Sequence, residues 1–178
     1  MRLPPSSFLL LAALLSLSQC KKNDLTPEEQ LPPATQTGAN TFGCLVNGQP
    51  WQPGGNDGTS NYSVYYDYSY AQGTLSVATY RLTGNGSDEQ VIGLGSDSLR
   101  TTGKYVLRTS GRHQADFINN QPRCAYYSSD KGTYCKGSFI ITRLDRTLGI
   151  VSGTFNFTLA KAGCDTIKVT QGRFDKKL

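Results

Sequence analysis

The sequence predicts a single all-β domain, an antiparallel β-sandwich or barrel of roughly ten short strands. Three observations favour this fold class. The 178 residues are rich in Gly, Ser, Thr and Tyr, a composition that suits strands and turns. Apolar and polar residues alternate over short runs, and Gly, Asn, Asp and Pro interrupt these runs at intervals typical of sandwiches and barrels. No part of the chain shows the period of about 3.6 residues that an amphipathic helix needs.

Each expected strand is a short alternating run bounded by turn residues. The first, residues 42–46, meets Asn47-Gly48, a two-residue hairpin signal. Residues 62–70 alternate strictly and lead through Ala71-Gln72-Gly73, which suits a three-residue hairpin loop. Gly153 lies on the apolar face of a strand, which predicts a bulge or a close backbone contact. The other strands are expected at residues 74–82, 90–94, 103–108, 114–118, 123–127, 133–144, 150–159 and 166–174.

The N-terminus has the features of an exported lipoprotein. Arg2 precedes an apolar run, residues 8–17, of signal-peptide length and too short to span a bilayer. The run ends at Leu17-Ser18-Gln19-Cys20, which resembles the lipobox of bacterial lipoproteins. That resemblance implies a cleaved signal peptide, residues 1–19, and an acylated Cys20 that anchors the chain in a lipid bilayer. An ordinary signal peptide followed by an unrelated cysteine is the alternative.

The mature chain is expected to have a tether and one domain. Residues 20–40 contain the lipidated cysteine, several prolines and charges, and no hydrophobic period, so we expect a disordered tether. Residues 41–178 then form the single β domain. The net charge of +5 falls to +4 when Arg2 leaves with the signal peptide. This excess is spread among acids, which indicates a solvated surface and no nucleic-acid ligand.

The cysteines predict two disulfides. An exported protein with five cysteines needs an explanation for one thiol, and acylation of Cys20 supplies it. Four cysteines remain and allow three pairings. We predict Cys124–Cys135, which are close in sequence, and Cys44–Cys164, which would tie the first strand to the last. The spacings lack a Cys-x-x-Cys pair, so no zinc site is expected.

A run of tyrosines is the most distinctive feature of the expected domain. Strict alternation puts Tyr62, Tyr66, Tyr68 and Tyr70 on one face of a strand. One interpretation is a half-buried face between core and solvent, because tyrosine has an apolar body and a polar hydroxyl. The other is an aromatic platform on which a sugar ring or a partner protein could stack. Trp51 is expected to be a core residue.

The sequence contains no recognisable catalytic constellation. A serine hydrolase needs a base, and His113 is the only histidine. Ser96 is one place away from its position in a Gly-x-Ser-x-Gly turn. Residues 56–58 form a turn that lacks the spaced acids of a calcium loop. We therefore expect no catalytic residue, metal or cofactor.

The domain resembles a family of uncharacterised lipoproteins from Bacteroidota that is classed as a domain of unknown function. The resemblance rests on residues 40–51, 137–145, 150–157, 163–166 and 172–175, which are strands, turns and cysteines. It implies a small β-rich domain of the cell envelope and brings no activity to transfer.

Two short motifs also resemble the O-glycosylation sites of that phylum, Asp97-Ser98-Leu99 and Asp165-Thr166-Ile167. They imply modification at Ser98 and Thr166.

The expected function is therefore binding at the cell envelope. We expect an outer-membrane-anchored lipoprotein, periplasmic or surface-exposed, that acts as a binding or interaction module for a glycan or protein ligand. A hydrolase acting on glycan or peptide is the alternative.

Overall fold

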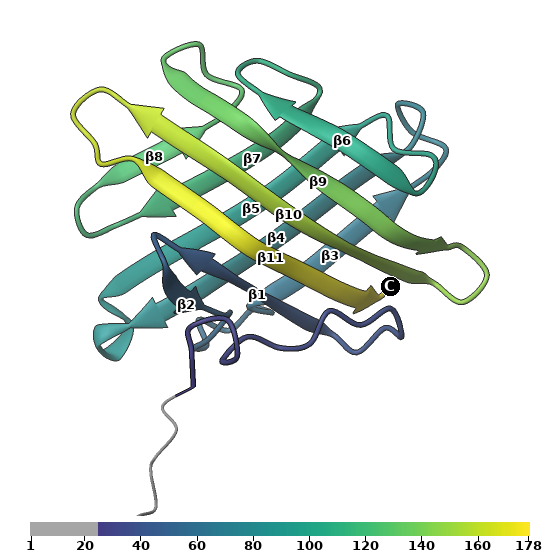
Figure 1. Cartoon of the computed structure of the whole chain (residues 1–178), viewed down its shortest axis with the longest axis horizontal. Coiled ribbons are helices and arrows are strands. Elements are labelled where there is room, and N and C mark those ends of the chain that lie inside the picture. Colours follow the sequence, from purple (N-terminus) through teal and green to yellow (C-terminus); the bar gives the residue numbers. More distant parts are fainter. Residues whose placement is uncertain (1–24) are drawn as a thin grey trace, which may run out of the picture.

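The computed structural model describes residues 25–178 as a sandwich of two antiparallel sheets (Figure 1). One sheet has six strands in the order β2-β1-β11-β10-β9-β6, and the other has five in the order β3-β4-β5-β7-β8. The strands are β1 (Thr41–Val46), β2 (Gln49–Trp51), β3 (Tyr62–Asp67), β4 (Thr74–Thr83), β5 (Asp88–Asp97), β6 (Gly103–Arg108), β7 (His113–Asn119), β8 (Cys124–Tyr127), β9 (Thr133–Asp145), β10 (Ile150–Lys161) and β11 (Ile167–Lys177), with a 3-10 turn, η2 (Gly84–Gly86). The expected all-β class is confirmed, and the sheets form a sandwich, not a closed barrel.

The core lies between the sheets and consists of the alternate residues that point inward. Phe42 and Cys44 of β1, Phe117 of β7 and Phe139 of β9 are all buried in it. Trp51 is fully buried, as expected, and its ring meets the edge of Phe42 with the centroids 5.8 Å apart. The alternation of apolar and polar residues that predicted the strands therefore also predicts which residues form the core.

Gly153 lies at a bulge in β10, as the sequence predicts. The register with β9 shifts between Ser152 and Gly153. A Cβ atom at this position would lie 2.5 Å from the carbonyl oxygen of Ile140 and 2.8 Å from the ring of Phe174. Only glycine permits so close an approach without a shift of the backbone.

The tyrosine-rich strand is shorter than expected. It ends at Asp67, whose carboxylate accepts hydrogen bonds from the backbone N–H and the hydroxyl of Ser69 at 2.8 and 2.7 Å. This side-chain hydrogen bonding competes with the backbone hydrogen bonds between β3 and β4, and β3 ends here. Ala71, Gln72 and Gly73 follow with positive φ, so the chain turns there into β4. Tyr68 and Tyr70 therefore lie in a loop, not on the strand.

The segment before β1 is held against the sandwich. Leu31 is buried, and Arg143 donates a hydrogen bond from Nη1 to the carbonyl of Gln36 at 2.5 Å. Asp175 accepts hydrogen bonds from the backbone N–H groups of Gly38 and Ala39 at 2.8 and 3.0 Å. We expected a disordered tether over residues 20–40. The described part, 25–40, lacks regular secondary structure but is docked, because a buried carboxylate binds its amides.

The predicted disulfide pairing is wrong. Cys124 is bonded to Cys164, and Cys44 and Cys135 are buried free thiols. Although Cys124 and Cys135 are close in sequence, β8 and β9 belong to different sheets. Cys124 begins β8 at the edge of its sheet and meets the loop between β10 and β11. The bond therefore joins the two sheets at one end of the sandwich.

The expected signal peptide, residues 1–19, and the expected acylation site, Cys20, lie outside the described residues. Within residues 25–178, no helix is long and apolar enough to cross a membrane.

Candidate functional site

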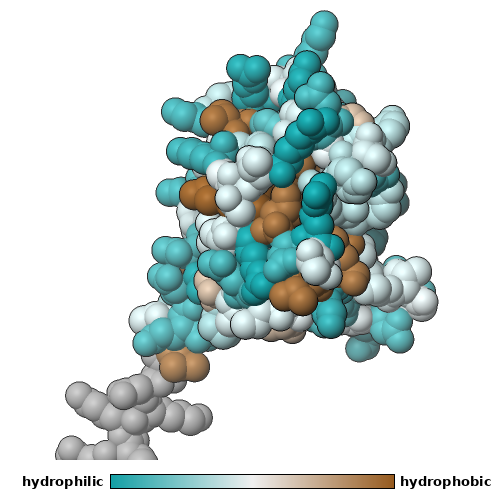
Figure 2. All heavy atoms as spheres, turned by 90° about the vertical axis from the view of Figure 1, so that its right-hand side faces the viewer, coloured by the Kyte–Doolittle hydropathy of each residue, from teal (hydrophilic) through white to brown (hydrophobic). Residues whose placement is uncertain are grey.

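Tyrosine and arginine side chains line two hollows at one end of the sandwich. The loops of this end lie on the right in Figure 1. Three loops meet there: β3–β4, β5–β6 and β9–β10. Two adjoining hollows, of about 590 and 390 Å³, open among them, and Tyr66, Tyr68 and Arg146 line both. Arg100 lines the larger hollow. Figure 2 looks onto this end and shows hydrophilic side chains projecting around hydrophobic ones. We call Tyr66, Tyr68, Arg100 and Arg146 the loop-end site.

Tyr66 connects the loop-end site to the core. It is the last inward-facing residue of β3, is half-buried, and packs against the core cluster. Its hydroxyl donates a hydrogen bond to the carbonyl of Leu99 at 2.9 Å. Burial raises the pKa of Tyr66, so the phenol stays protonated as a donor. The ring is therefore held in a fixed position at the base of the site.

Tyr68 presents an exposed ring beside a cation. It is 59% exposed, and the guanidinium carbon of Arg146 lies 4.6 Å from its ring centroid. A guanidinium at this distance over an aromatic ring is a cation–π contact, which restricts both side chains. Within the described residues, Arg146 has no ion-pair partner. Its charge therefore remains available to a ligand.

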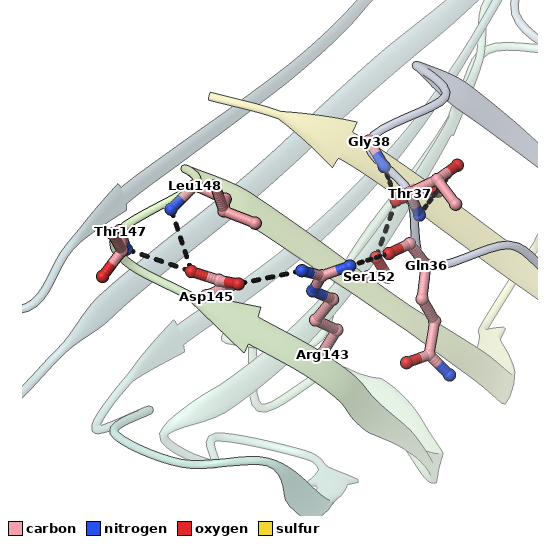
Figure 3. Close-up of polar contacts among 9 residues, drawn as sticks. Gln36, Thr37, Gly38, Arg143, Asp145, Thr147, Leu148 and Ser152 are labelled. Carbon is pink, nitrogen blue, oxygen red and sulfur yellow. Dashed lines mark hydrogen bonds and ion pairs between the residues drawn. The ribbon is translucent and has the colours of Figure 1, made fainter.

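Hydrogen bonds brace the β9–β10 turn that carries Arg146. Figure 3 shows the bonds made by Asp145, its neighbour in the chain. Asp145 accepts hydrogen bonds from the backbone N–H groups of Thr147 and Leu148 at 3.1 and 2.9 Å, and it pairs with Arg143 at 2.8 Å. Hydrogen bonds from the Leu148 amide and from Arg143 hold the pKa of Asp145 below its ordinary value. The turn is therefore braced on both sides of Arg146.

Arg100 supplies a second cation. Its Nε donates a hydrogen bond to the carbonyl of Gln72 at 3.1 Å, which links the β5–β6 loop to the β3–β4 loop. Gly73 brings these loops together, because a Cβ atom there would clash with the carbonyl of Leu99. Leu99 in turn donates its N–H to the carbonyl of Gly73 at 2.8 Å.

Of the four tyrosines expected to form one platform, the structure brings two together in the loop-end site. Tyr66 and Tyr68 line the same hollows, and Tyr70 is 69% exposed in the same loop. Tyr62 is buried in the core at the far end of β3, and Nζ of Lys176 lies 4.7 Å from its ring centroid. The prediction that all four tyrosines lie on one face of a strand is therefore wrong. Strand periodicity could not predict Arg100 and Arg146 as site residues, because they come from two loops that are distant in sequence.

A serine–histidine contact is also present, and neither of its residues lines the loop-end hollows. Ser96 and His113 face each other across β5 and β7, and Oγ of Ser96 lies 2.8 Å from Nδ1 of His113. Burial, with Arg108 and Arg112 nearby, lowers the pKa of His113. Ser96 is only 3% exposed, and His113 packs edge-on against Tyr105. This geometry keeps the hydroxyl from a substrate, and no carboxylate among the described residues bonds the histidine ring.

The remaining predicted modification sites lie in loops. Thr166 is exposed just before β11, and Ser98 is half-buried after β5. O-glycosylation at either position stays a prediction. Within residues 25–178, no group of three or more His, Cys, Asp or Glu side chains is arranged to hold a metal ion.

The fold and the loop-end site define a small β-sandwich with an open aromatic and cationic surface at one end. The chain belongs to the DUF6252 family, a domain of unknown function, whose model matches residues 57–176. The match begins after β2, so the first hairpin and the docked segment 25–40 lie outside it. Comparisons with curated proteins and with solved structures find no match.

Proposed function

We propose that this protein is a lipid-anchored binding module of the cell envelope, held at the outer membrane by acylated Cys20, with a glycan as its ligand. The anchor rests on the lipobox-like N-terminus. Only residues 21–24 would separate an acylated Cys20 from the docked segment 25–40, which supports a position of the sandwich close to the lipid surface.

The loop-end site carries the ligand part of the proposal. An exposed tyrosine ring, fixed by a cation–π contact, can stack against the apolar face of a sugar ring. Two guanidinium groups beside it donate several hydrogen bonds each to hydroxyl or acidic groups of the sugar. Arg100 and Arg146 have no ion-pair partner within the described residues, which favours a glycan with acidic substituents.

A glycan fits this surface better than a protein ligand does. Tyrosine and arginine are also common at protein interfaces. However, the site consists of two adjoining hollows, whereas an interface patch of standard size covers far more of a small protein's surface. The hollows are of a size that suits one or two sugar rings.

Binding is also better supported than hydrolysis. Among the described residues, the contact between Ser96 and His113 resembles part of a hydrolase site, but Ser96 is buried and the pair does not line the loop-end hollows. Binding requires only the exposed groups that the loop-end site supplies.

A glycan array probed with the full-length chain tests the proposal. We expect binding to acidic glycans that is lost in Tyr68→Ala and in Arg146→Gln, while both variants stay folded. Tyr134→Ala is the matched control, because Tyr134 is also exposed but lies on β9. An array without binding, or equal loss in the control, would contradict the proposal. Capture of a protein through the same residues would replace the glycan by a protein ligand.

A further inference from the structure

Another cavity lies at the opposite end of the sandwich, beside the β1–β2 hairpin and the β10–β11 loop. These two turns lie on the left in Figure 1. The volume of the cavity is about 320 Å³, within the range of small-molecule sites. One wall comes from β4, β5, β7 and β8 of the five-stranded sheet. The other comes from the β1–β2 hairpin and the start of β11. The Cys124–Cys164 disulfide joins the two walls at the cavity, since Cys124 lines it. We call this space the inter-sheet cleft.

Three polar side chains form a row along one wall of the cleft. Arg81 pairs with Gln90 across β4 and β5, and Gln90 pairs with Asn119 across β5 and β7. All three line the cleft. They continue the inward-facing positions that elsewhere hold core residues, such as Val77, Ile92 and Phe117. Hydrophobic burial therefore does not explain them, because polar groups at core positions cost free energy unless they are bonded.

Arg81 is only partly satisfied by the protein. Its Nη1 donates to the carbonyl of Pro50 at 3.2 Å, and its Nη2 donates to Oε1 of Gln90 at 2.7 Å. A guanidinium has five N–H donors, so others remain. Its Nε is buried without a hydrogen-bond partner. No carboxylate among the described residues forms an ion pair with it.

Gln90 and Asn119 also have unused donors. Oε1 of Gln90 accepts hydrogen bonds from Arg81 and from Nε1 of Trp51, the latter at 2.9 Å. Oδ1 of Asn119 accepts from the backbone N–H of Gln121. The side-chain NH2 groups of both residues make no hydrogen bond within the described part of the chain. The row therefore offers a cation and two amide donors, while the oxygen of Gln90 already accepts two hydrogen bonds and that of Asn119 accepts one.

The other residues that line the cleft determine which chemical groups a ligand can carry outside its contact with the polar row. Val46, Pro122 and Ile167 supply apolar surface, whereas Phe117 and Tyr126 lie almost fully buried behind it. The hydroxyl of Tyr126 is already bonded to the carbonyl of Asp165. Asp165 itself is exposed on the opposite wall from Arg81, so a negative group is favoured only near the polar row.

We propose that the inter-sheet cleft is a second binding site, for a small organic acid whose carboxylate meets Arg81, Gln90 and Asn119 and whose apolar body packs on Val46 and Ile167. A carboxylate has two acceptor oxygens that match the planar donor fork of arginine. This site is separate from the loop-end site and does not depend on the function proposed there.

Calorimetric titration of the full-length chain in detergent tests this site. The probes are a panel of straight-chain and phenyl-substituted carboxylates, each compared with its neutral amide. We expect several acids of the panel to bind and their amides to bind at least roughly tenfold more weakly, as the loss of a charge-assisted hydrogen bond implies. No binding by any acid, or equal binding of acids and amides, would overturn the proposal.

Two variants locate the binding. Arg81→Gln removes the cation, and Gln90→Glu neutralises it while keeping an acceptor for Trp51 and Arg81. Because Gln90→Glu is nearly isosteric and adds an ion pair, it tests the site even if Arg81→Gln fails to fold. We expect roughly tenfold or greater loss of acid binding in Gln90→Glu. Arg108→Gln, an exposed change on β6, is the control. Unchanged affinity in a folded Gln90→Glu protein would overturn the assignment.

Discussion

Ser152 of β10 donates its hydroxyl hydrogen to Oδ1 of Asp175 on β11 at 2.7 Å, in a site where both residues are buried. The other oxygen of the carboxylate accepts hydrogen bonds from the hydroxyl of Thr35 and the backbone N–H of Thr37 at 2.7 and 2.9 Å. No cation among the described residues pairs with Asp175. Burial acts to raise the pKa of Asp175, but these hydrogen bonds hold it well below its ordinary value. The charge is therefore stabilised by donors alone.

Asp175→Asn should destabilise the protein and release the docked segment. We expect the free energy of unfolding to fall by on the order of 3 kcal/mol at about pH 7. The side-chain NH2 of asparagine would replace one acceptor oxygen and face the N–H and O–H groups that now donate to Asp175. The folded pKa lies below the unfolded value of about 3.9, so the stabilisation is complete above that value. It is lost as the pH falls toward the folded pKa. The gap between wild type and variant should therefore narrow at about pH 3.

Urea unfolding of both proteins at the two pH values checks this expectation. Asp130→Asn is the control, since Asp130 is exposed and its carboxylate makes no hydrogen bond within the described residues. A gap that stays constant or widens on acidification would contradict the assigned role of Asp175.

The cysteines should fall into two chemical classes. Burial raises the pKa of the Cys44 thiol to about 12 and that of Cys135 to about 11, so both stay protonated and unreactive in the folded protein. An alkylating reagent should label these two thiols only after the protein is denatured, and no reductant should be needed. Peptide mapping should recover Cys124 joined to Cys164. Any other disulfide, or labelling of Cys44 in the folded state, would show this arrangement to be wrong.

Removing the disulfide should cost stability at the end of the sandwich where it lies. The bonded residues are 40 positions apart, and closing a loop of this size contributes about 4 kcal/mol in the chain-entropy model. We expect Cys124→Ser to lower the free energy of unfolding by an amount of this order, measured in denaturant. Cys135→Ser is the comparison, because it alters a buried thiol without removing a cross-link.

The proposed anchor makes a prediction in cells. Cys20→Ser should leave the protein uncleaved or mislocalised and remove it from the detergent phase of a phase-separation experiment. The wild type should incorporate labelled fatty acid, and Cys44→Ser should do so equally. Incorporation by Cys20→Ser would place the acyl group elsewhere.

Local patterns predicted the strands well because alternation and turn residues act over a few positions. Asn47 does take positive φ in the first hairpin, and Gly153 does mark a bulge. The sequence also indicated Trp51 as a core residue, since a large aromatic beside a hairpin has few other places to pack. β2 was missed, and both β5 and β11 extend by several residues beyond their expected bounds. Proline, glycine and charged residues weaken the strand signal in these segments.

Features that depend on which strands become neighbours could not be predicted. The pairing of Cys124 and Cys135 assumed that β8 and β9 are adjacent, whereas the chain changes sheets between them. The row formed by Arg81, Gln90 and Asn119 exists only because of the register of three strands. The docked segment was missed because the contacts that hold it, the burial of Leu31 and the hydrogen bonds to Asp175, are made with residues far away in sequence.

Replacing each tyrosine by alanine should lower the free energy of unfolding by an amount that depends on its place on β3 or in the following loop. Tyr62 is buried, so Tyr62→Ala should cost about 3–5 kcal/mol, as aromatic truncations in cores do. Tyr66→Ala should be clearly destabilising but less so, because its ring is half-buried and its hydroxyl bonds Leu99. Tyr68→Ala and Tyr70→Ala should change stability by less than about 1 kcal/mol, since both side chains are mostly exposed.

Denaturant unfolding of the four alanine variants and of a Tyr66→Phe variant measures this gradient. Tyr66→Phe keeps the ring and removes only the hydrogen bond to Leu99, so it should recover most of the loss seen in Tyr66→Ala. If all four alanine variants were equally severe, the exposed rings would be part of the scaffold and could not serve as a free surface for stacking. If Tyr68→Ala and Tyr70→Ala leave stability unchanged, any loss of ligand binding in them reports on contact with the ligand, because the fold beneath the loop remains intact.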